Sequence, residues 1–434
     1  MPRIIIHRGA HTIGGNCVEL QSKGYRILMD MGMPLMKKGG GELDEDDLKS
    51  PCVKNEILPN IKGLYKADNP SILAIFISHS HIDHCGLLNY VHPAIPVYCS
   101  PGTYSLIKTG QVFYPSPSKN FFNNFKVFEH WKPIQQGPFK ITSYLMDHSG
   151  FDASAFLVEV DHKKVFYSGD FRGHGRKSKV LQIFFKKSIS NTDCLLLEGT
   201  TLGGKHHIGF KNENEVEDAL FNVFSKQKDT SFIAAAGSNV DRIVSLYKAS
   251  RKSSKILVLD LYAYYLLNQL KKITPSLPPF DGDNIRIYYI RGHAQNLADH
   301  LGKRLLYEFK PRKIEINEIC ENRHNMVLKL PVSAMTKISK VLIKEKSFLN
   351  AKFIFSMWSG YLKKDSAFQN FCDEFHADLI QIHVSGHAYL SDLKKLACAL
   401  NAKKVIPIHT LNRNTYSKHF KNVTRIEDGV AFKI

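Results

Sequence analysis

The sequence contains no Cys-x-x-Cys pair and no apolar run long enough to cross a membrane. Its eight cysteines are scattered along 434 residues, which excludes a dense disulfide framework and a zinc ribbon. This use of cysteine favours a reducing, cytoplasmic setting. The first residues also lack the charged segment and apolar stretch of a secretory signal. We therefore expect neither secretion nor a membrane partner.

The chain also lacks the low hydrophobicity of disordered proteins. Hydrophobic residues make up 43% of it and charged residues 23%, which excludes a disordered or fibrous protein. The length allows about two or three domains. Charge is unbalanced, because 59 Lys and Arg outnumber 40 Asp and Glu and give a formal net charge of +19. Such an excess favours a polyanionic partner such as nucleic acid, but it does not identify a reaction.

Two patterns of hydrophobic residues divide the chain. In the first 200 residues or so, short β-branched and aliphatic runs such as Ile72–Ile77 predict a strand-rich half with one sheet packed on another. Farther on, strands such as Ser231–Ala235 alternate with helices such as Asn239–Ala249, which predicts a parallel α/β sheet. The polar stretch Asn317–Asn325 is expected to be a loop.

The strongest functional signal follows the apolar run Ile72–Ile77 and precedes a helix expected from Cys85 onward. On this loop His79 and His81 would turn toward one metal ion, and Asp83 and His84 would turn toward a second. A dinuclear site with nitrogen and oxygen ligands requires such an arrangement. A solvated loop seldom has such a cluster, so the pattern predicts a metal centre. The four metal-capable side chains, within six residues, are His79, His81, Asp83 and His84.

This motif resembles the zinc signature of the metallo-β-lactamase superfamily, and further elements follow the superfamily pattern in chain order. Asp30, at the end of a predicted strand, resembles the acid that supports the metal-binding loop through hydrogen bonds. His148 resembles the last histidine of the first zinc, and Asp170 resembles the acid that bridges both ions. Each of these residues alone has a plainer explanation as a turn former or a surface residue. Their joint occurrence with the histidine cluster favours the metal site.

The second half resembles the β-CASP branch of that superfamily, in particular the ribonuclease J-like nucleases. Glu198, His387 and His409 match its motifs A, B and C, although motif A reads Glu-Gly-Thr-Thr where the family more often has Ser or Thr directly after the acid. The resemblance implies an α/β fold: a metallo-β-lactamase αββα sandwich at 1–205 and 356–434, with an inserted α/β β-CASP domain at 206–355. It also implies that His409 completes the second zinc, and a histidine at motif C favours RNA over DNA.

Within the insertion, a candidate phosphate site lies at the start of a predicted helix. There Ser238, Asn239 and Arg242 would hold a phosphate through free backbone N–H groups and a guanidinium. An ordinary helix cap with a surface arginine explains the same residues equally well. Ser385 and Gly386, next to His387, are further candidates for phosphate or RNA binding.

The implied reaction is hydrolysis of single-stranded RNA, from the 5′ end, at internal bonds or both. A hydroxide bridging two Zn²⁺ ions would attack the phosphorus, and Mn²⁺ would be a possible substitute metal. Asp83 would orient or deprotonate that water. His387, held by Glu198, would protonate the leaving oxygen, or would bind the phosphate without proton transfer.

Three alternatives stay open at this point: a DNA nuclease with the same fold and metals, a non-catalytic RNA-binding subunit, and a small-molecule hydrolase. The sequence ends about where the catalytic core of ribonuclease J closes. We therefore expect that any oligomer forms without the additional C-terminal domain of that family.

Overall fold

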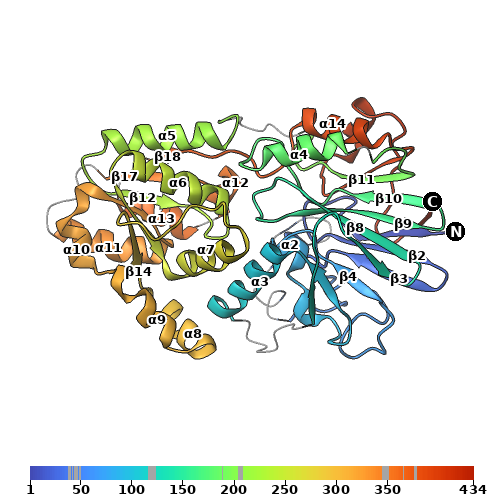
Figure 1. Cartoon of the computed structure of the whole chain (residues 1–434), viewed down its shortest axis with the longest axis horizontal. Coiled ribbons are helices and arrows are strands. Elements are labelled where there is room, and N and C mark those ends of the chain that lie inside the picture. The colour runs from blue at the N-terminus through green and yellow to red at the C-terminus, as the bar shows by residue number, and fades with distance from the viewer. Residues whose placement is uncertain are drawn as a thin grey trace. The chain divides into compact units, whose positions relative to one another are not determined.

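The computed structural model describes residues 1–37, 41, 43, 47, 50–115, 124–187, 189–203, 209–344, 351–364, 366–375 and 379–434. The chain divides into two compact units (Figure 1). The first unit comprises Met1–Ile107, Ser116–His206 and Gly386–Ile434, and the second comprises Lys108–Pro115 and His207–Ser385.

The first unit contains a seven-stranded and a six-stranded sheet, with the orders β20-β1-β2-β3-β4-β5-β6 and β19-β11-β10-β9-β8-β7. Strand β1 pairs antiparallel with β20, so the two ends of the chain lie side by side (Figure 1). The strands of the first sheet are β1 (Arg3–Arg8), β2 (Cys17–Ser22), β3 (Tyr25–Met29), β4 (Ala74–Phe76), β5 (Val97–Cys99), β6 (Phe125–Val127) and β20 (Ala431–Lys433). Those of the second are β7 (Pro133–Gln136), β8 (Phe139–Leu145), β9 (Ser154–Val160), β10 (Lys163–Tyr167), β11 (Cys194–Glu198) and β19 (Val405–Ile408).

Apolar side chains alternate between the two faces of these sheets and produce four layers. The inner faces share one core, in which Phe76 of the first sheet contacts Phe156 of the second at 5.8 Å between ring centroids. The outer face of the first sheet packs against α2 (Ile82–Cys85) and the start of α3 (Pro101–Phe113). The outer face of the second packs against α4 (Ser178–Lys186) and α14 (Leu390–Leu400). These layers form the αββα sandwich that the sequence predicts.

The second unit is built on a seven-stranded sheet with the order β15-β14-β13-β16-β12-β17-β18, in which every pair is parallel. This confirms the parallel α/β arrangement predicted from the alternating pattern. The strands are β12 (Ser231–Ala234), β13 (Ile256–Asp260), β14 (Ile285–Tyr288), β15 (Lys313–Ile314), β16 (Met326–Lys329), β17 (Lys352–Phe355) and β18 (Leu379–Gln381). The helices are α5 (Glu213–Lys226), α6 (Val240–Lys252), α7 (Leu261–Ile273), α8 (Arg291–Leu301), α9 (Arg304–Phe309), α10 (Ile316–Glu321), α11 (Val332–Lys344), α12 (Ser359–Lys364) and α13 (Ser366–Glu374).

The segment 356–385 belongs to the second unit. The sequence analysis instead assigns this segment to the returning part of the sandwich. The reason for its place in the second unit is strand pairing, because β18 adds to the parallel sheet beside β17 and the aromatic rings of α13 join the core of that sheet. The chain returns to the first unit only at Gly386.

The stretch 317–325, expected to be a loop, is largely helical. Helix α10 begins after Glu315, whose side chain forms a capping box with Glu318. The helix also buries Ile319 and Cys320 in the core of the second unit. The sequence analysis missed this helix because polar residues surround these two apolar ones. Among the described residues, no helix is both long and apolar enough to span a bilayer.

Glu19 is a buried carboxylate that joins three strands of the first sheet. It lies on the central strand β2, where His7 Nε2 of β1 is 2.8 Å from Oε2 and Arg26 Nη2 of β3 donates to Oε2 at 3.0 Å. Burial opposes its ionisation, but the hydrogen bonds from His7 and Arg26 outweigh this effect and lower the pKa of Glu19 to about 2.

We expect Glu19→Gln to lower the free energy of unfolding by about 3 kcal/mol at neutral pH, because the pKa falls from 4.5 in the unfolded chain to about 2 in the folded one. Since the folded-state pKa is depressed, this stability is present above about pH 4.5 and is lost as the pH falls toward 2. Urea unfolding of both proteins between about pH 7 and pH 3 measures the difference, which should shrink with acid.

The matched control is Glu159→Gln, which removes a more exposed carboxylate paired with Lys140 at 3.0 Å. This substitution should cost less than about 1 kcal/mol. A Glu19→Gln penalty that did not change with pH would assign the effect to packing rather than to charge.

Candidate metal centre

The predicted metal-binding side chains meet at one edge of the first unit, where strands of both sheets end. They come from segments far apart in the sequence, and parallel strands bring them together because their carboxyl ends share an edge. The positions are His79 and His81 after β4, Asp83 and His84 on α2, His148 after β8, Asp170 after β10 and His409 after β19.

Helix α2 begins earlier than the sequence pattern suggests. It starts at Ile82 rather than Cys85, so Asp83 and His84 lie on its first turn, whereas His79 and His81 lie on the loop before it. This change of backbone direction separates the four residues of the motif into two groups.

The first group consists of His79, His81 and His148, whose ligand atoms all lie within 4.8 Å of one another. His148 Nε2 is 3.3 Å from His81 Nδ1. Burial and the neighbouring histidines lower the pKa of His79 and His148 well below the usual value, and burial lowers that of His81 to about 4. Three neutral imidazoles that face one point are suitable nitrogen ligands for a divalent metal.

The second group consists of Asp83, His84 and His409, again within 4.8 Å of one another. His409 Nε2 is 3.2 Å from Asp83 Oδ2. Asp170 lies beside both groups, since its Oδ2 is 3.9 Å from His79 Nε2 and 3.2 Å from His84 Nε2. This is the position that a bridging carboxylate needs.

Charge in the second group favours a cation. Burial lowers the pKa of His84, but Asp170, Asp30 and Asp83 outweigh it and raise the pKa well above its usual value. The pKa of Asp170 is well below its usual range, because His409 and His84 overcome the effect of its burial. The carboxylates are therefore ionised at neutral pH.

Several buried atoms at the centre lack conventional partners. Among the described residues, His79 Nε2, His84 Nε2 and both carboxylate oxygens of Asp170 form no hydrogen bond. Buried polar atoms without partners destabilise a fold by about 1–3 kcal/mol each. Buried nitrogen and oxygen atoms grouped in this way fit a divalent metal, which would supply the missing partners.

Asp30, which the sequence analysis expects to support the metal-binding loop, makes hydrogen bonds around the centre. Its Oδ1 accepts the backbone N–H of Ser78 at 2.6 Å, and its Oδ2 accepts the hydroxyls of Ser78 at 2.7 Å and Tyr167 at 2.6 Å. His84 Nδ1 lies 2.7 Å from the same Oδ2, which leaves Nε2 directed at the metal-binding atoms. Sequence reasoning missed Ser78 and Tyr167, although Ser78 directly precedes His79 and Tyr167 lies three residues before Asp170.

Two further contacts orient histidines. His148 Nδ1 lies 2.6 Å from the carbonyl oxygen of Gly386, so this backbone group orients a candidate metal-binding histidine. Thr200 Oγ1 lies 2.8 Å from His409 Nδ1. Sequence reasoning did not predict this contact. Thr200 belongs to the Glu-Gly-Thr-Thr run that departs from the family pattern, and this departure was the one sign in the sequence that the residue is special.

His387 and Glu198 form a pair beside the metal-binding atoms. His387 Nδ1 lies 3.6 Å from Glu198 Oε1 and 3.6 Å from Asp170 Oδ2. Burial lowers the pKa of His387, but these two carboxylates outweigh it and raise the pKa to about 9. The His387 side chain is 24% exposed, whereas that of His84 is fully buried. His387 is thus a protonated group within reach of a ligand from solvent.

Glu198 is itself fixed by backbone donors. Thr200 N donates to Oε2 at 3.0 Å and Ala388 N donates to Oε1 at 3.2 Å. Backbone strain marks the same region, because Asp30 and His409 have φ values of 60° and 53°. Such left-handed conformations in residues other than glycine concentrate at functional sites.

The candidate phosphate site of the second unit differs from expectation. Arg242 is fully buried, and its guanidinium donates to Glu213 Oε1 at 3.1 Å and to the carbonyl oxygen of Ser356 at 2.8 Å. It is therefore not available to a phosphate. Asn239 caps α6 by accepting Arg242 N at 3.1 Å, as the helix-cap explanation requires. Ser238 and Ser385 are half-buried on loops at the sheet edge.

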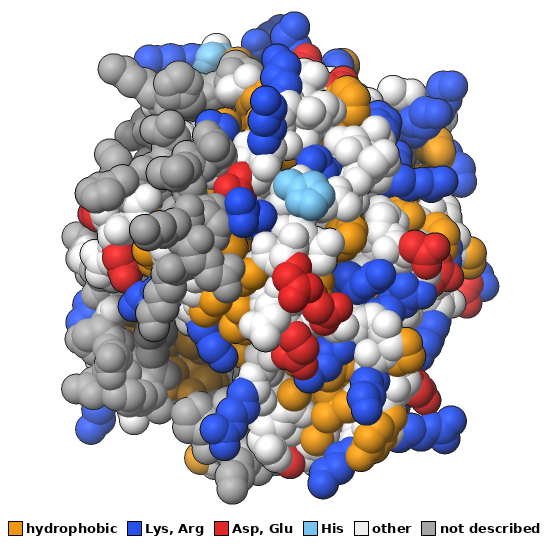
Figure 2. Space-filling view, turned by 90° about the vertical axis from the view of Figure 1, so that its left-hand side faces the viewer, with side chains coloured by type: hydrophobic (Ala, Val, Ile, Leu, Met, Phe, Trp, Pro, Cys, Tyr) orange, Lys and Arg blue, Asp and Glu red, His pale blue; other side chains and the backbone are white. Residues whose placement is uncertain are grey.

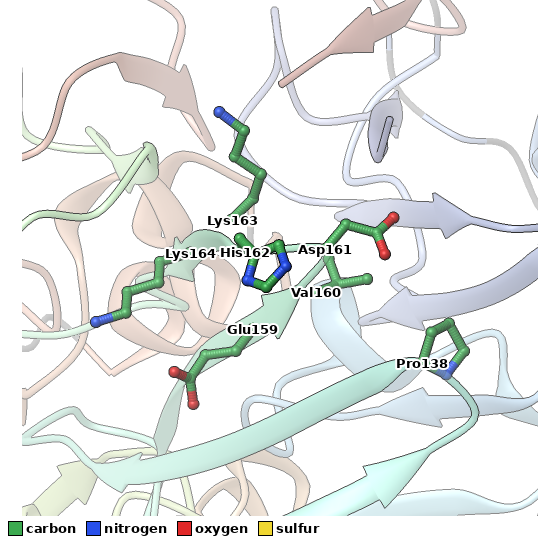
Figure 3. A pocket seen from close by; sticks show the side chains of 7 residues that line it. All are labelled: Pro138, Glu159, Val160, Asp161, His162, Lys163 and Lys164. Atoms are coloured by element: carbon green, nitrogen blue, oxygen red, sulfur yellow. The ribbon is translucent and has the colours of Figure 1, made fainter.

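A separate pocket lies at the turn between β9 and β10 (Figure 3). It has a volume of about 450 Å³ and is lined by Pro138 and residues 159–164, with side chains of both charges. Asp170 follows the other end of β10. The pocket is therefore not part of the metal-binding cluster.

Comparisons with known proteins agree with this geometry. Residues 54–222 match the family described as "Beta-lactamase superfamily domain", and residues 374–424 match "Zn-dependent metallo-hydrolase RNA specificity domain". The chain is similar to ribonuclease J of Helicobacter pylori strain B128 (23% identity, 97% of this chain and 59% of the relative). It is also similar to ribonuclease J of Mycoplasma genitalium (21% identity, 94% of this chain and 67% of the relative).

The fold has a solved counterpart. A crystal structure of a protein of unknown function from Enterococcus faecalis V583 matches with a TM-score of 0.78 at 21% identity and covers 99% of both chains. These findings confirm the metallo-β-lactamase fold and the resemblance to ribonuclease J. The chain spans about 59% of the length of the H. pylori ribonuclease J.

We expect Asp30→Asn to weaken divalent-metal affinity by about 10- to 100-fold, because His84 loses the carboxylate that orients its ring. Asparagine suits the left-handed backbone at this position, so the effect should come from the lost oxygen acceptor rather than from strain. Competition with a chromophoric chelator measures the affinity.

The matched control is Asp161→Asn, which changes another left-handed aspartate at the turn that lines the pocket. Its affinity should equal that of the unaltered protein. Equal affinities for all three proteins would exclude a supporting role for Asp30.

Proposed function

We propose that this chain, which carries a metallo-β-lactamase superfamily domain and resembles ribonuclease J along nearly its whole length, is a divalent-metal-dependent ribonuclease acting on single-stranded RNA. The observation that carries the proposal is the pair of His387 and Glu198, with Nδ1 3.6 Å from Oε1, directly beside two groups of metal-binding side chains. Phosphodiester hydrolysis needs both parts, because the attacked phosphate and the leaving oxygen each acquire negative charge.

The donor set suits two ions, for which we propose Zn²⁺ with Mn²⁺ as a substitute. His79, His81 and His148 would hold one ion, and Asp83, His84 and His409 the other, with Asp170 between them. Ions bound there would supply Lewis-acid neutralisation of the phosphate and a water nucleophile active at neutral pH.

The remaining steps belong to the protein's own side chains. Asp83, whose carboxylate lies among these metal-binding atoms, would orient the attacking water. His387 would donate its proton to the leaving oxygen, and the fixed carboxylate of Glu198 would keep the imidazole protonated and aligned. Asp30, Gly386 and Thr200 each contact a ring nitrogen of a metal-binding histidine, so they would position the site without touching the substrate.

RNA as the substrate is supported by the RNA specificity domain match, by the names of the relatives and by the net charge of +19. Figure 2 shows basic side chains spread over one face of the molecule and interrupted by acidic ones. A charge distributed in this way would attract a flexible polyanion at many points, so binding should weaken steeply as salt rises. We propose cleavage from the 5′ end, at internal bonds or both.

Metal-loaded protein should cleave single-stranded RNA in preference to DNA of the same sequence, and His81→Ala should abolish the cleavage by removing a ligand. A gel of end-labelled strands measures both. Mononucleotide products would indicate cleavage from the end of the strand, and longer internal fragments would indicate cleavage at internal bonds. Preferential cleavage of DNA would instead indicate a DNA nuclease. Binding of RNA without cleavage of either strand would indicate a non-catalytic subunit.

We expect His387→Ala to lower kcat on RNA by about 10²- to 10⁴-fold, because the leaving oxygen loses its proton donor. The loss should largely disappear on an RNA whose leaving oxygen is replaced by sulfur, since a thiolate leaves without protonation. Single-turnover rates on both substrates provide the measurement. An equal loss on both would assign His387 to phosphate binding rather than to proton transfer.

A further inference from the structure

Three loops meet at one edge of the parallel sheet in the second unit. Strands β12, β17 and β18 are neighbours with the same direction, so the loops that follow them share the carboxyl edge. These loops contain Ser238, Trp358 and Ser385 in turn. The carboxyl edge of a parallel sheet is where such folds bind their ligands.

The buried Arg242 fastens these loops to one another. It belongs to the first turn of α6, and its Nη1 donates to the carbonyl oxygens of Ser356 at 2.8 Å and Ile382 at 3.4 Å. Glu213 neutralises the guanidinium, with Oε1 at 3.1 Å from Nη2. Ser356 directly precedes the Met357–Trp358 segment, so the backbone that carries Trp358 is anchored on both neighbouring loops.

Trp358 has a large exposed ring on this anchored backbone. The residue is 54% exposed, and Tyr361, whose ring meets it edge to face at 5.5 Å between centroids, is 51% exposed. The indole also lies against Gly360, where a Cβ would be only 2.3 Å from the ring carbons. Glycine is therefore required for the ring to occupy this position. The indole is held in place while more than half of the residue faces water.

The other tryptophan of the chain has a different environment. Trp131 packs edge to face on Tyr144 at 4.7 Å, and the ammonium of Lys187 lies 4.3 Å from the centre of its ring. Trp131 thus contributes to packing in the first unit, whereas more than half of Trp358 stays exposed despite its contact with Tyr361. Leaving an indole in water costs hydrophobic free energy, so a held and exposed ring suits a ligand that covers it.

We propose that Trp358, supported by Gly360 and Tyr361, is a stacking platform for an unpaired nucleobase of a single-stranded nucleic acid. This inference rests on the proposed ribonuclease function. The indole of Trp358 offers a flat face about the size of a base, with the ring of Tyr361 edge to face beside it. The neighbouring loops at the same sheet edge contain Ser238 and Ser385. A base in a duplex is already covered on both faces, so the platform would favour single strands over duplexes.

The experiment uses the full chain and single-stranded RNA oligonucleotides, with binding measured by fluorescence anisotropy of a labelled strand. Trp358→Ala should raise Kd by about 5- to 150-fold, the effect of losing one stacked base. Trp358→Phe keeps a smaller ring and should lose less. Tyr307→Ala is the matched control, because Tyr307 is 68% exposed on α9 of the same unit and should leave Kd unchanged.

Abasic oligonucleotides identify the stacked position. One abasic nucleotide, moved along the strand, should weaken binding to the unaltered protein at a single position. At that position it should have no further effect on Trp358→Ala, because the two losses remove the same interaction. Additive losses at every position would overturn the proposal, and so would equal losses for Trp358→Ala and Tyr307→Ala.

The two proposals fail in distinguishable ways. If the unaltered protein cleaves RNA but Trp358→Ala binds it with the same Kd, the platform is excluded and the ribonuclease function stands. If the unaltered protein binds RNA through Trp358 without cleaving it, the platform stands and the catalytic function is excluded. If it neither binds nor cleaves RNA, both proposals are excluded.

Discussion

The carboxylate of Asp30 links the two sheets of the first unit to the metal-binding residues. It lies at the end of β3 and accepts hydrogen bonds from Ser78 after β4 and from Tyr167 at the end of β10. The same carboxylate contacts His84, which selects the ring nitrogen that faces the metal-binding atoms. The packing of one sheet on the other therefore sets the orientation of a ligand, and the left-handed backbone of Asp30 is tolerated because these contacts hold it.

The second unit uses a buried charge for a similar purpose. Arg242 lies in the interior with Glu213 and joins three loops at the edge of a parallel sheet. A charge in that position is stable only when its hydrogen bonds are complete, because an unpaired buried ion would lose its hydration without compensation. The result is a rigid edge on which an exposed tryptophan can be presented in a fixed orientation.

Charge has two separate functions in this protein. Inside the metal centre, ionised carboxylates and the neutral imidazoles of His79, His81 and His148 are concentrated in a buried volume that suits a divalent cation. On the face shown in Figure 2, lysine and arginine are dispersed among acidic residues, which suits a long polyanion better than a small anionic ligand. His387, partly exposed beside buried ligands, lies where these two environments meet.

The sequence by itself determined the α/β class, most strands and the order of the metal-binding residues. It did so because hydrophobic alternation and the His79–His84 spacing are local features of the chain. Only the tertiary structure decided which unit holds 356–385, since the partner of β18 lies on another segment. It also decided that Arg242 is buried, that Gly386 and Thr200 orient histidines, and that Trp358 is exposed. Burial and partners depend on contacts between residues far apart in the sequence, and one sequence does not specify those contacts.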